Sequence, residues 1–211
     1  MNTPQAEQTT GADGATPMRK VISLMHVSLD GFTTGPNGEL EWARVDEETY
    51  TYVADLLRTV DTALYGRITY HMMESYWPTV PANPASTPEE RQHAHWVEHA
   101  HKIVFSRTLE GVTWHNTRLV KQDIADEVAR LKHLPGTDMM IFGSPSIVHT
   151  LAQRSLIDEY RINVNPVVLG GGIPLFTDIT APITLELLGT RVFHSGAVEL
   201  HYRTGPDGGA P

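Results

Sequence analysis

The chain has 211 residues and a mass of 23.4 kDa, the size of one domain that can bury a full hydrophobic core. It contains no cysteine, which excludes disulfides, thiolate metal sites, iron–sulfur clusters and a cysteine nucleophile. The formal net charge of −9 argues against a nucleic-acid groove or an anionic membrane surface as the partner. There is no run of about 18 apolar residues and no basic start followed by an apolar stretch, so we expect no membrane span, no secretory signal and a cytoplasmic protein.

The two ends of the sequence differ in composition from the middle. Residues 1–17 are rich in Thr, Gln, Gly, Ala and Pro and hold almost no large apolar side chain, so they predict a disordered extension. Residues 205–211 are rich in Gly and Pro and predict a flexible tail. The sequence therefore predicts one folded domain over residues 18–204.

Apolar runs alternate with helix-like stretches in the first half of this domain. The short apolar run at 20–27 is typical of a buried strand, whereas residues 46–60 carry apolar side chains at helical spacing behind an acidic first turn. In chain order we predict a strand at 20–27, a helix at 46–60, a strand at 62–65, a helix at 67–76, a proline-rich loop at 79–88, and a helix from the capping box at 87–90 to about 101.

The second half repeats this alternation and then changes character. In chain order we predict a strand at 102–106, extended pieces at 112–115 and 118–121, a helix at 124–133, a strand at 138–142, a helix ending at 154, a long strand at 157–169, and a hairpin of 184–193 with 197–203. Strands alternating with helices, followed by a hairpin, predict an α/β fold whose central sheet is mostly parallel with antiparallel edge strands.

Three of the predicted strands end in small, hydroxyl-bearing or basic residues. The segments are Gly66-Arg67-Ile68-Thr69, Ser106-Arg107-Thr108 and Gly143-Ser144-Pro145-Ser146, and the first and third open helices. Ligands of open parallel sheets bind at the carboxyl ends of the strands, where glycine admits a phosphate and the first N–H groups of a helix hold it. The pattern indicates a dinucleotide phosphate cradle, although ordinary strand–helix junctions use the same residue types.

Two common nucleotide-binding motifs are missing. No G-x-G-x-x-G follows the first strand and no G-x-x-x-x-G-K-[ST] occurs, which excludes a standard Rossmann dehydrogenase and a P-loop NTPase. The run Gly170-Gly171-Gly172 follows a strand without the continuation that a phosphate loop needs. We interpret it as a bulge or bend.

Several short segments together resemble one superfamily. The segments that carry the resemblance are Ser28-Leu29-Asp30-Gly31, Tyr65-Gly66-Arg67-x-Thr69-Tyr70, Lys102 to Leu109, Ile141-x-Gly143-Ser144, Leu156 to Arg161 and Pro166 to Phe176. In their types and order they are similar to the dihydrofolate reductase-like superfamily, and most of all to the C-terminal reductase domain of the bifunctional riboflavin-biosynthesis deaminase–reductase and its stand-alone relatives. The resemblance covers residues 19–203.

The resemblance implies a three-layer αβα fold with NADPH as hydride donor. It implies that Gly66, Arg67 and Thr69 lie near the phosphates, and that Ser106 and Arg107 lie at the adenosine 2′-phosphate. The pyrophosphate would be held by the helix start formed by Gly143, Ser144, Pro145 and Ser146. The loop from Ser28 to Gly31 would lie near the nicotinamide and the substrate.

The resemblance also bounds the reaction. The H-x-E and P-C-x-x-C motifs of the fused deaminase are absent, so this chain cannot carry out the preceding deamination. It implies reduction of a small pterin- or aminouracil-like substrate. The alternatives are a true dihydrofolate reductase and a non-catalytic nucleotide-binding module on the same fold.

Acidic residues are the candidates for a proton source or a substrate anchor, because hydride transfer to a polarised double bond also needs a proton. In folate reductases this acid lies in the first helix, which points to Asp46, Glu47 or Glu48 here. The other interpretation of these acids is that they cap the helix and stabilise its dipole. Asp30 is the remaining candidate, and its alternative role is that of a simple Asp-Gly turn.

Two further expectations concern metals and assembly. His95 and His99 share a helix face at i, i+4 spacing, but the glutamate that zinc proteases need after the first histidine is replaced by Trp96, so we expect no metal site. The predicted strand at 157–169 and the terminal hairpin hold much apolar surface for a sheet edge. Together with the resemblance to dimeric reductase domains, this predicts a homodimer.

Overall fold

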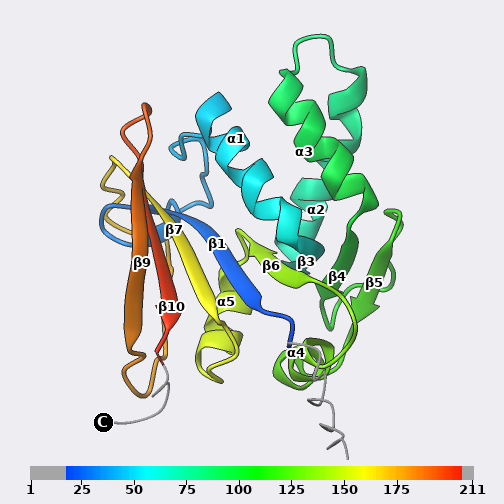
Figure 1. Cartoon of the computed structure of the whole chain (residues 1–211), viewed down its shortest axis with the longest axis vertical. Coiled ribbons are helices and arrows are strands. Elements are labelled where there is room, and N and C mark those ends of the chain that lie inside the picture. Colours follow the sequence, from blue (N-terminus) through cyan, green and yellow to red (C-terminus); the bar gives the residue numbers. More distant parts are fainter. Residues whose placement is uncertain (1–17, 206–211) are drawn as a thin grey trace, which may run out of the picture.

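The computed structural model describes residues 18–205 and contains one eight-stranded sheet with helices on both faces (Figure 1). Its strand order is β5-β4-β3-β6-β1-β7-β10-β9. The strands are β1 (Val21–Ser28), β3 (Val60–Gly66), β4 (His101–Phe105), β5 (Thr117–Val120), β6 (Asp138–Phe142), β7 (Glu159–Asn165), β9 (Leu185–Val192) and β10 (Val198–Thr204). The first six strands in this order run parallel, and β10 runs antiparallel to both of its neighbours, β7 and β9, which confirms the predicted fold class.

Five α-helices of the described chain cover the two faces of this sheet. They are α1 (Glu47–Leu56), α2 (Arg67–Tyr76), α3 (Pro88–His99), α4 (Ile124–Lys132) and α5 (Pro145–Ala152). Helices α1, α2 and α3 lie on one face, here called the α1 face, and α4 and α5 lie on the other, the α4 face (Figure 1). A small second sheet pairs β2 (Phe32–Thr34) with β8 (Ile173–Pro174).

Strand β1 shows how the sequence divides the core between these faces. Side chains alternate along a strand, so a central strand buried on both sides reads as a continuous apolar run. Ile22 and Leu24 belong to the hydrophobic cluster on the α1 face, whereas Val21, Met25 and Val27 belong to the cluster on the α4 face. This is why the run at 20–27 predicted a buried strand correctly.

The helix predicted at 46–60 is shorter than expected. Helix α1 ends at Leu56 and is followed by a 3-10 turn, η1 (Leu57–Thr59). Val60 fits the apolar helical spacing, but its backbone is extended and it begins β3, where it pairs with Asp138 of β6. Val60 is buried, so packing against the sheet decides its conformation over the helical pattern. The predicted strand at 62–65 therefore starts two residues too late.

The extended piece predicted at 112–115 is not a strand. The backbone N–H groups of Thr113 and Trp114 both donate to the Tyr70 hydroxyl of α2, at 3.2 and 3.3 Å. A side chain satisfies these donors, so no neighbouring strand is needed. The loop predicted at 79–88 also contains a 3-10 turn, η2 (Trp77–Ala82).

The strand predicted at 157–169 is also too long. Strand β7 covers Glu159–Asn165 and ends before Pro166, which has no N–H to donate to a sheet ladder. After Pro166, the N–H of Val167 donates to the carbonyl of Asn165 at 2.8 Å, which closes a tight turn directly after the strand. The predicted C-terminal hairpin is confirmed as β9 and β10.

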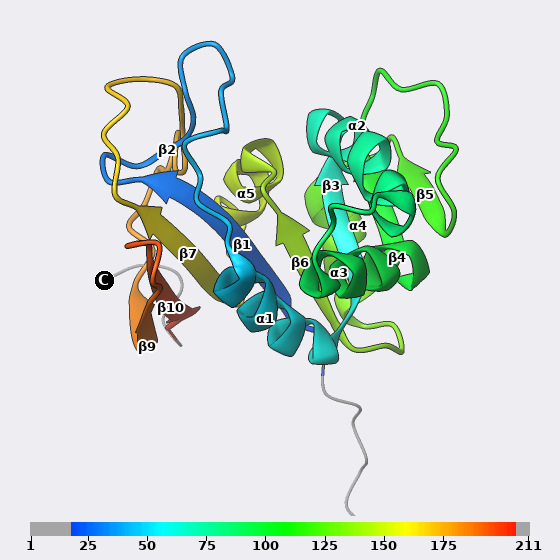
Figure 2. The ribbon, with the colours of Figure 1, turned by 90° about the horizontal axis from the view of Figure 1, so that it is seen from above.

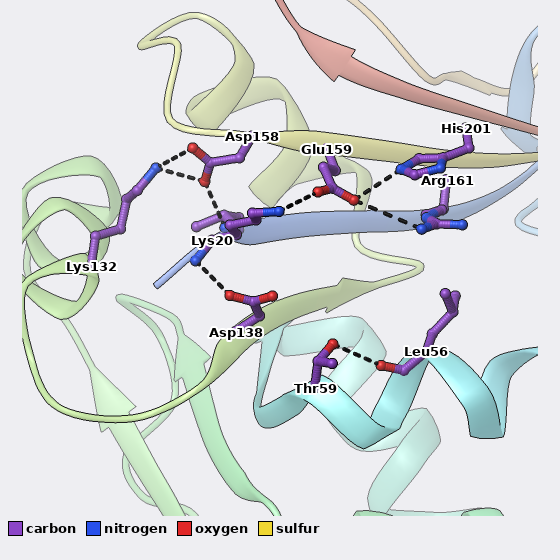
Figure 3. A network of polar contacts seen from close by, with 10 residues as sticks. Lys20, Leu56, Thr59, Lys132, Asp138, Asp158, Glu159, Arg161 and His201 are labelled. Carbon is purple, nitrogen blue, oxygen red and sulfur yellow. Dashed lines mark hydrogen bonds and ion pairs between the residues drawn. The ribbon is translucent and has the colours of Figure 1, made fainter. Parts of the chain in front are cut away.

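An ionic network fastens the amino end of the central strands (Figure 3). Lys20 Nζ donates to Glu159 at 2.8 Å, and the Nε2 of His201 lies 2.9 Å from the other oxygen of the same carboxylate. Partial burial raises the pKa of Glu159, but the hydrogen bonds from Lys20 and His201 outweigh it and bring the pKa below its ordinary value. Lys132, at the end of α4, lies 2.6 Å from Asp158. These contacts lie at the amino end of the parallel strands. The network therefore does not occupy the carboxyl ends of the strands.

Two expectations fall partly outside the described structure. The extension predicted at 1–17 and residues 206–211 of the predicted tail lie outside the described residues. Gly205, the first residue of that tail, donates its N–H to the carbonyl of Thr184 at 3.0 Å. Within residues 18–205, no helix is both long and apolar enough to cross a bilayer.

Candidate cofactor-binding site

The three strand ends singled out in the sequence lie next to one another. Strands β4, β3 and β6 are neighbours in the sheet, and Gly66 at the end of β3 pairs with Phe105 at the end of β4. The Gly66 N–H donates to the Ser144 hydroxyl, just beyond β6, at 2.9 Å. The structure therefore brings the segments at 66–69, 106–108 and 143–146 to one edge of the sheet.

Gly66 is required by the close approach of the two helix starts. A Cβ atom at this position would lie 2.7 Å from the Ser144 hydroxyl oxygen and 3.1 Å from that of Ser146. The hydroxyl of Thr69 donates to the Gly143 carbonyl at 3.3 Å and ties the first turn of α2 to the entry of α5. Gly143 has a φ of +52°, a left-handed conformation that glycine adopts most easily.

Helices α2 and α5 begin differently from the other α-helices of residues 18–205. The starts of α1, α3 and α4 are capped by the side chains of Asp46, Thr87 and Asp123, and each has acids in its first turn. Helices α2 and α5 have neither a side-chain cap nor an acid in the first turn. Their first N–H groups and the positive ends of their dipoles are therefore available to an anion.

The turn after β4 presents a cation beside these helix starts. The hydroxyl oxygen of Ser106 accepts hydrogen bonds from the N–H groups of Thr108 and Leu109, at 3.2 and 3.1 Å, and so fixes the turn. Arg107 at its tip is exposed and forms no ion pair with any residue of 18–205. Arg67, the first residue of α2, is exposed as well.

Asp30 lies away from this cradle and holds a loop. Its carboxylate accepts hydrogen bonds from the N–H groups of Leu169 and Gly170, at 3.1 and 2.8 Å. Hydrogen bonding from Ser28, together with these two backbone donors, lowers the pKa of Asp30 to about 2. A carboxyl group that stays ionised near neutral pH is a hydrogen-bond acceptor rather than a reservoir of protons.

The glycine run in that loop is a turn packed against β2, in line with the bend interpretation. Gly172 has a φ of +130°, and a Cβ atom there would lie 1.9 Å from the carbonyl oxygen of Thr34. Backbone sterics therefore account for this glycine without a phosphate. Asp30 and this turn together join the end of β1 to the chain after β7.

The acids at the start of α1 are divided between capping and solvent. Asp46 accepts from the N–H and the hydroxyl of Thr49, at 2.9 and 2.7 Å; burial raises its pKa, but these hydrogen bonds outweigh it and lower the pKa. Glu48 accepts from the His194 N–H at 2.9 Å, which lowers its pKa. Glu47 is exposed. None of the three lies at the paired starts of α2 and α5.

Sequence reasoning did not single out a pair of polar side chains inside the sheet. His26 of β1 and Asn163 of β7 are register partners on the α1 face. Asn163 is completely buried, and neither of its amide atoms has a hydrogen-bond partner within residues 18–205. The available indication was weak: His26 interrupts the apolar run of β1, but Asn163 lies in a strand that contains several other polar residues.

Comparison with known proteins places this architecture in a family. Residues 19–198 match the family described as the RibD C-terminal domain. The uncharacterized protein YyaP of Bacillus subtilis is 36% identical over 186 residues, which are 87% of this chain and 94% of that protein. A protein of Shewanella sp. PV-4 assigned to riboflavin biosynthesis has 23% identity and a TM-score of 0.70, over 88% of this chain and 99% of that one.

Two further solved structures share the fold. The diaminohydroxyphosphoribosylaminopyrimidine deaminase/5-amino-6-(5-phosphoribosylamino)uracil reductase of Thermotoga maritima has 13% identity and a TM-score of 0.62, over 89% of this chain and 57% of that one. A dihydrofolate reductase of Enterococcus faecalis, solved with NADP(H), has 14% identity and a TM-score of 0.57, over 88% and 96% of the two chains. The extent of the family match and the identity to YyaP establish that the chain belongs to the RibD C-terminal domain family, with a dihydrofolate reductase-like fold.

Proposed function

We propose that the chain is an NADPH-dependent reductase of a small heterocyclic substrate, of the 5-amino-6-(5-phosphoribosylamino)uracil reductase type. The observation that carries the proposal is the pair of uncapped helix starts joined by the contact between Gly66 and Ser144. Such a pair fits the pyrophosphate of a dinucleotide, because each helix start offers N–H donors and a positive dipole end. Membership of a reductase-domain family supports the same assignment.

The side chains around the cradle suit NADPH in particular. Gly66, Arg67 and Thr69 would hold the phosphates from the side of α2, and the start of α5 from Gly143 to Ser146 would hold the pyrophosphate. Ser106 and Arg107 would take the adenosine 2′-phosphate, for which a free guanidinium is a suitable partner. Bound NADPH would supply the hydride.

The substrate would lie between the turn at Asp30 and the start of α1. Asp30 would shape this region by holding the loop after β7, since its carboxylate is ionised near neutral pH. Asp46 would keep the start of α1 in place as its cap. Glu47, exposed in the first turn, is the acid among the three candidates that is left to orient the substrate or pass a proton.

The direct test is the substrate-dependent oxidation of NADPH, followed by the absorbance of the reduced nicotinamide. We expect turnover with 5-amino-6-(5-phosphoribosylamino)uracil and little with dihydrofolate. Turnover with dihydrofolate alone would identify a true dihydrofolate reductase. Tight NADPH binding without turnover on any heterocycle would contradict the enzyme assignment and favour a nucleotide-binding module.

We also propose that the protein forms a homodimer through the edge strand β9. Leu187, Leu188 and Val192 are 52%, 41% and 71% exposed on this strand, which ends the sheet. An antiparallel pairing of two β9 strands would satisfy the free backbone groups of this edge.

Light scattering at micromolar concentration is expected to give about twice the chain mass of 23.4 kDa. Leu188→Lys should shift the protein to the monomer, because a charge on an edge strand opposes pairing. Leu134→Lys, at an apolar side chain that is 39% exposed after α4, is the matched control and should remain dimeric. A wild-type mass of one chain would refute the dimer. In keeping with the acidic chain, the proposal includes no nucleic-acid partner and no membrane partner. It places the protein in the cytoplasm.

A further inference from the structure

Unsatisfied polar atoms gather on one patch of the α1 face, at the middle of the sheet. His26, Asn163 and Glu199 occupy neighbouring register positions on β1, β7 and β10. Within residues 18–205, four buried side-chain atoms of this patch have no hydrogen-bond partner: Nδ1 of His26, Nδ2 and Oδ1 of Asn163, and Nε of Arg161. Buried donors and acceptors of a folded protein are normally satisfied, so this concentration points to a missing partner.

Glu199 and the Nη1 atom of Arg161 already have partners in the patch, whereas Nε of Arg161 and the amide of Asn163 have none among residues 18–205. The Glu199 carboxylate accepts from the Tyr52 hydroxyl at 2.6 Å and from Arg161 Nη1 at 3.3 Å. Neither Nδ2 nor Oδ1 of Asn163 has a hydrogen-bond partner among residues 18–205, although the residue is completely buried. Burial lowers the pKa of the adjacent His26 to about 4, so this ring is neutral near pH 7. The free hydrogen-bonding capacity of the patch is therefore that of a carboxamide beside a neutral imidazole, together with one guanidinium N–H, at Nε of Arg161.

The segment at 41–46, which has no regular secondary structure, lies against β7 beside the patch. The Arg44 N–H donates to Asn165 Oδ1 at 2.9 Å, and its guanidinium donates to the carbonyl of Ser195 at 3.0 Å. Residues 41–46 contain no helix or strand, and Figure 2 shows the segment between β2 and α1 passing beside the carboxyl ends of β1 and β7. Opening of these two hydrogen bonds would free the segment that contacts Asn165, which lies two residues from Asn163 on the same face of β7.

We propose that Asn163 is a specificity-determining residue that binds the lactam edge of the heterocyclic substrate, with His26 beside it as a second hydrogen-bonding group. A carboxamide offers one donor and one acceptor, which match the adjacent C=O and N–H of a lactam such as a uracil ring. A carboxylate, in contrast, offers two acceptors and matches a protonated amidine edge. The inference rests on the proposed reductase function and selects uracil-type substrates within it.

The test measures the binding of two small probes to the NADPH-saturated protein by calorimetry. We expect the wild type to bind 5,6-diaminouracil more tightly than 2,4-diaminopyrimidine. A matched bidentate pair of hydrogen bonds contributes a large part of the discrimination between two such rings. Asn163→Leu should therefore weaken the binding of 5,6-diaminouracil roughly ten- to a hundredfold. Asn163→Asp should gain affinity for protonated 2,4-diaminopyrimidine by a similar factor.

Ser23→Ala is the matched control. Ser23 also lies on β1 and has a buried hydroxyl without a partner among the described residues, but it faces the α4 side, so this variant should bind both probes like the wild type. Unchanged NADPH affinity shows that a variant has folded. The assignment is overturned if the wild type binds neither probe, or if both Asn163 variants bind the probes as the wild type does.

The outcome is separable from that of the proposed function. Binding of 5,6-diaminouracil that depends on Asn163, without any NADPH oxidation, would support the recognition site and overturn the reductase. NADPH oxidation by an aminouracil whose KM is unchanged in Asn163→Leu would support the reductase and overturn this role of Asn163.

Discussion

Replacing Arg107 by alanine is expected to weaken NADPH binding roughly ten- to a hundredfold and to change NADH binding little, because one charge-assisted hydrogen-bonding group contributes about 1.5–3 kcal/mol. NADPH differs from NADH only by its 2′-phosphate, and a chain with net charge −9 repels that group at long range. Discrimination must therefore come from local donors. Arg107 lies at the tip of a turn fixed by Ser106, with its guanidinium free of ion pairs to residues 18–205.

Arg67→Ala provides the matched comparison, since Arg67 is also an exposed arginine, at the start of α2. It is assigned to the phosphates that both cofactors share, so its loss should weaken the binding of NADPH and of NADH by similar factors. Titration of both variants with both cofactors at one salt concentration measures the difference. If Arg107→Ala weakens NADH as much as NADPH, the 2′-phosphate lies elsewhere.

Acidification from pH 6.5 to 4 is expected to destabilise the fold by about 3 kcal/mol through His93 alone, since one pKa unit corresponds to 1.36 kcal/mol. His93 of α3 is 8% exposed and packs against the ring of Trp77, with 4.3 Å between ring centroids. Burial lowers its pKa to about 4 from an ordinary value of 6.5. Between these values the unfolded chain binds a proton that the folded chain does not, so stability falls as the pH falls.

His93→Phe should remove this part of the pH dependence, because phenylalanine fills the aromatic site without a titratable group. His95→Gln, at an exposed histidine of the same helix, should leave the pH dependence unchanged. Urea unfolding at pH 7, 6, 5 and 4 measures the free energy of unfolding for each protein. Parallel pH curves for wild type and His93→Phe would show that His93 titrates normally in the folded state.

The strand ends were predictable because their chemistry is local. Gly66, Ser106 and Gly143 each follow an apolar run directly, and the carboxyl ends of parallel strands share one edge of the sheet. Which strands are neighbours does not follow from that pattern, because β6 lies between β3 and β1 in space but follows both in the chain. The contact that joins α2 to α5 thus depends on the order of the strands in the sheet, which the local sequence pattern does not predict.

Other features depend on contacts that no local pattern encodes. Val60 continues the helical spacing of the preceding residues, and only its pairing with β6 makes it a strand residue. From the sequence, Asp30 is either a turn residue or a candidate proton source. Its hydrogen bonds to Leu169 and Gly170 connect positions about 140 residues apart, which no local pattern encodes. The pairing of His26 with Asn163 likewise joins two strands that are distant in the sequence.

The contact between Gly66 and Ser144 links residues 78 positions apart, which couples the cradle to the folding of the whole sheet. A chain in which β6 has not yet paired with β3 has two separate helix starts and no cradle. Under the proposed function, a cofactor would therefore bind only a chain whose central sheet is complete, and its binding would stabilise the native state through that long-range pairing. At a ligand concentration a hundred times Kd, mass action adds about 2.7 kcal/mol to the free energy of unfolding. This gain depends on the pairing of β3 with β6, two strands that are far apart in the sequence.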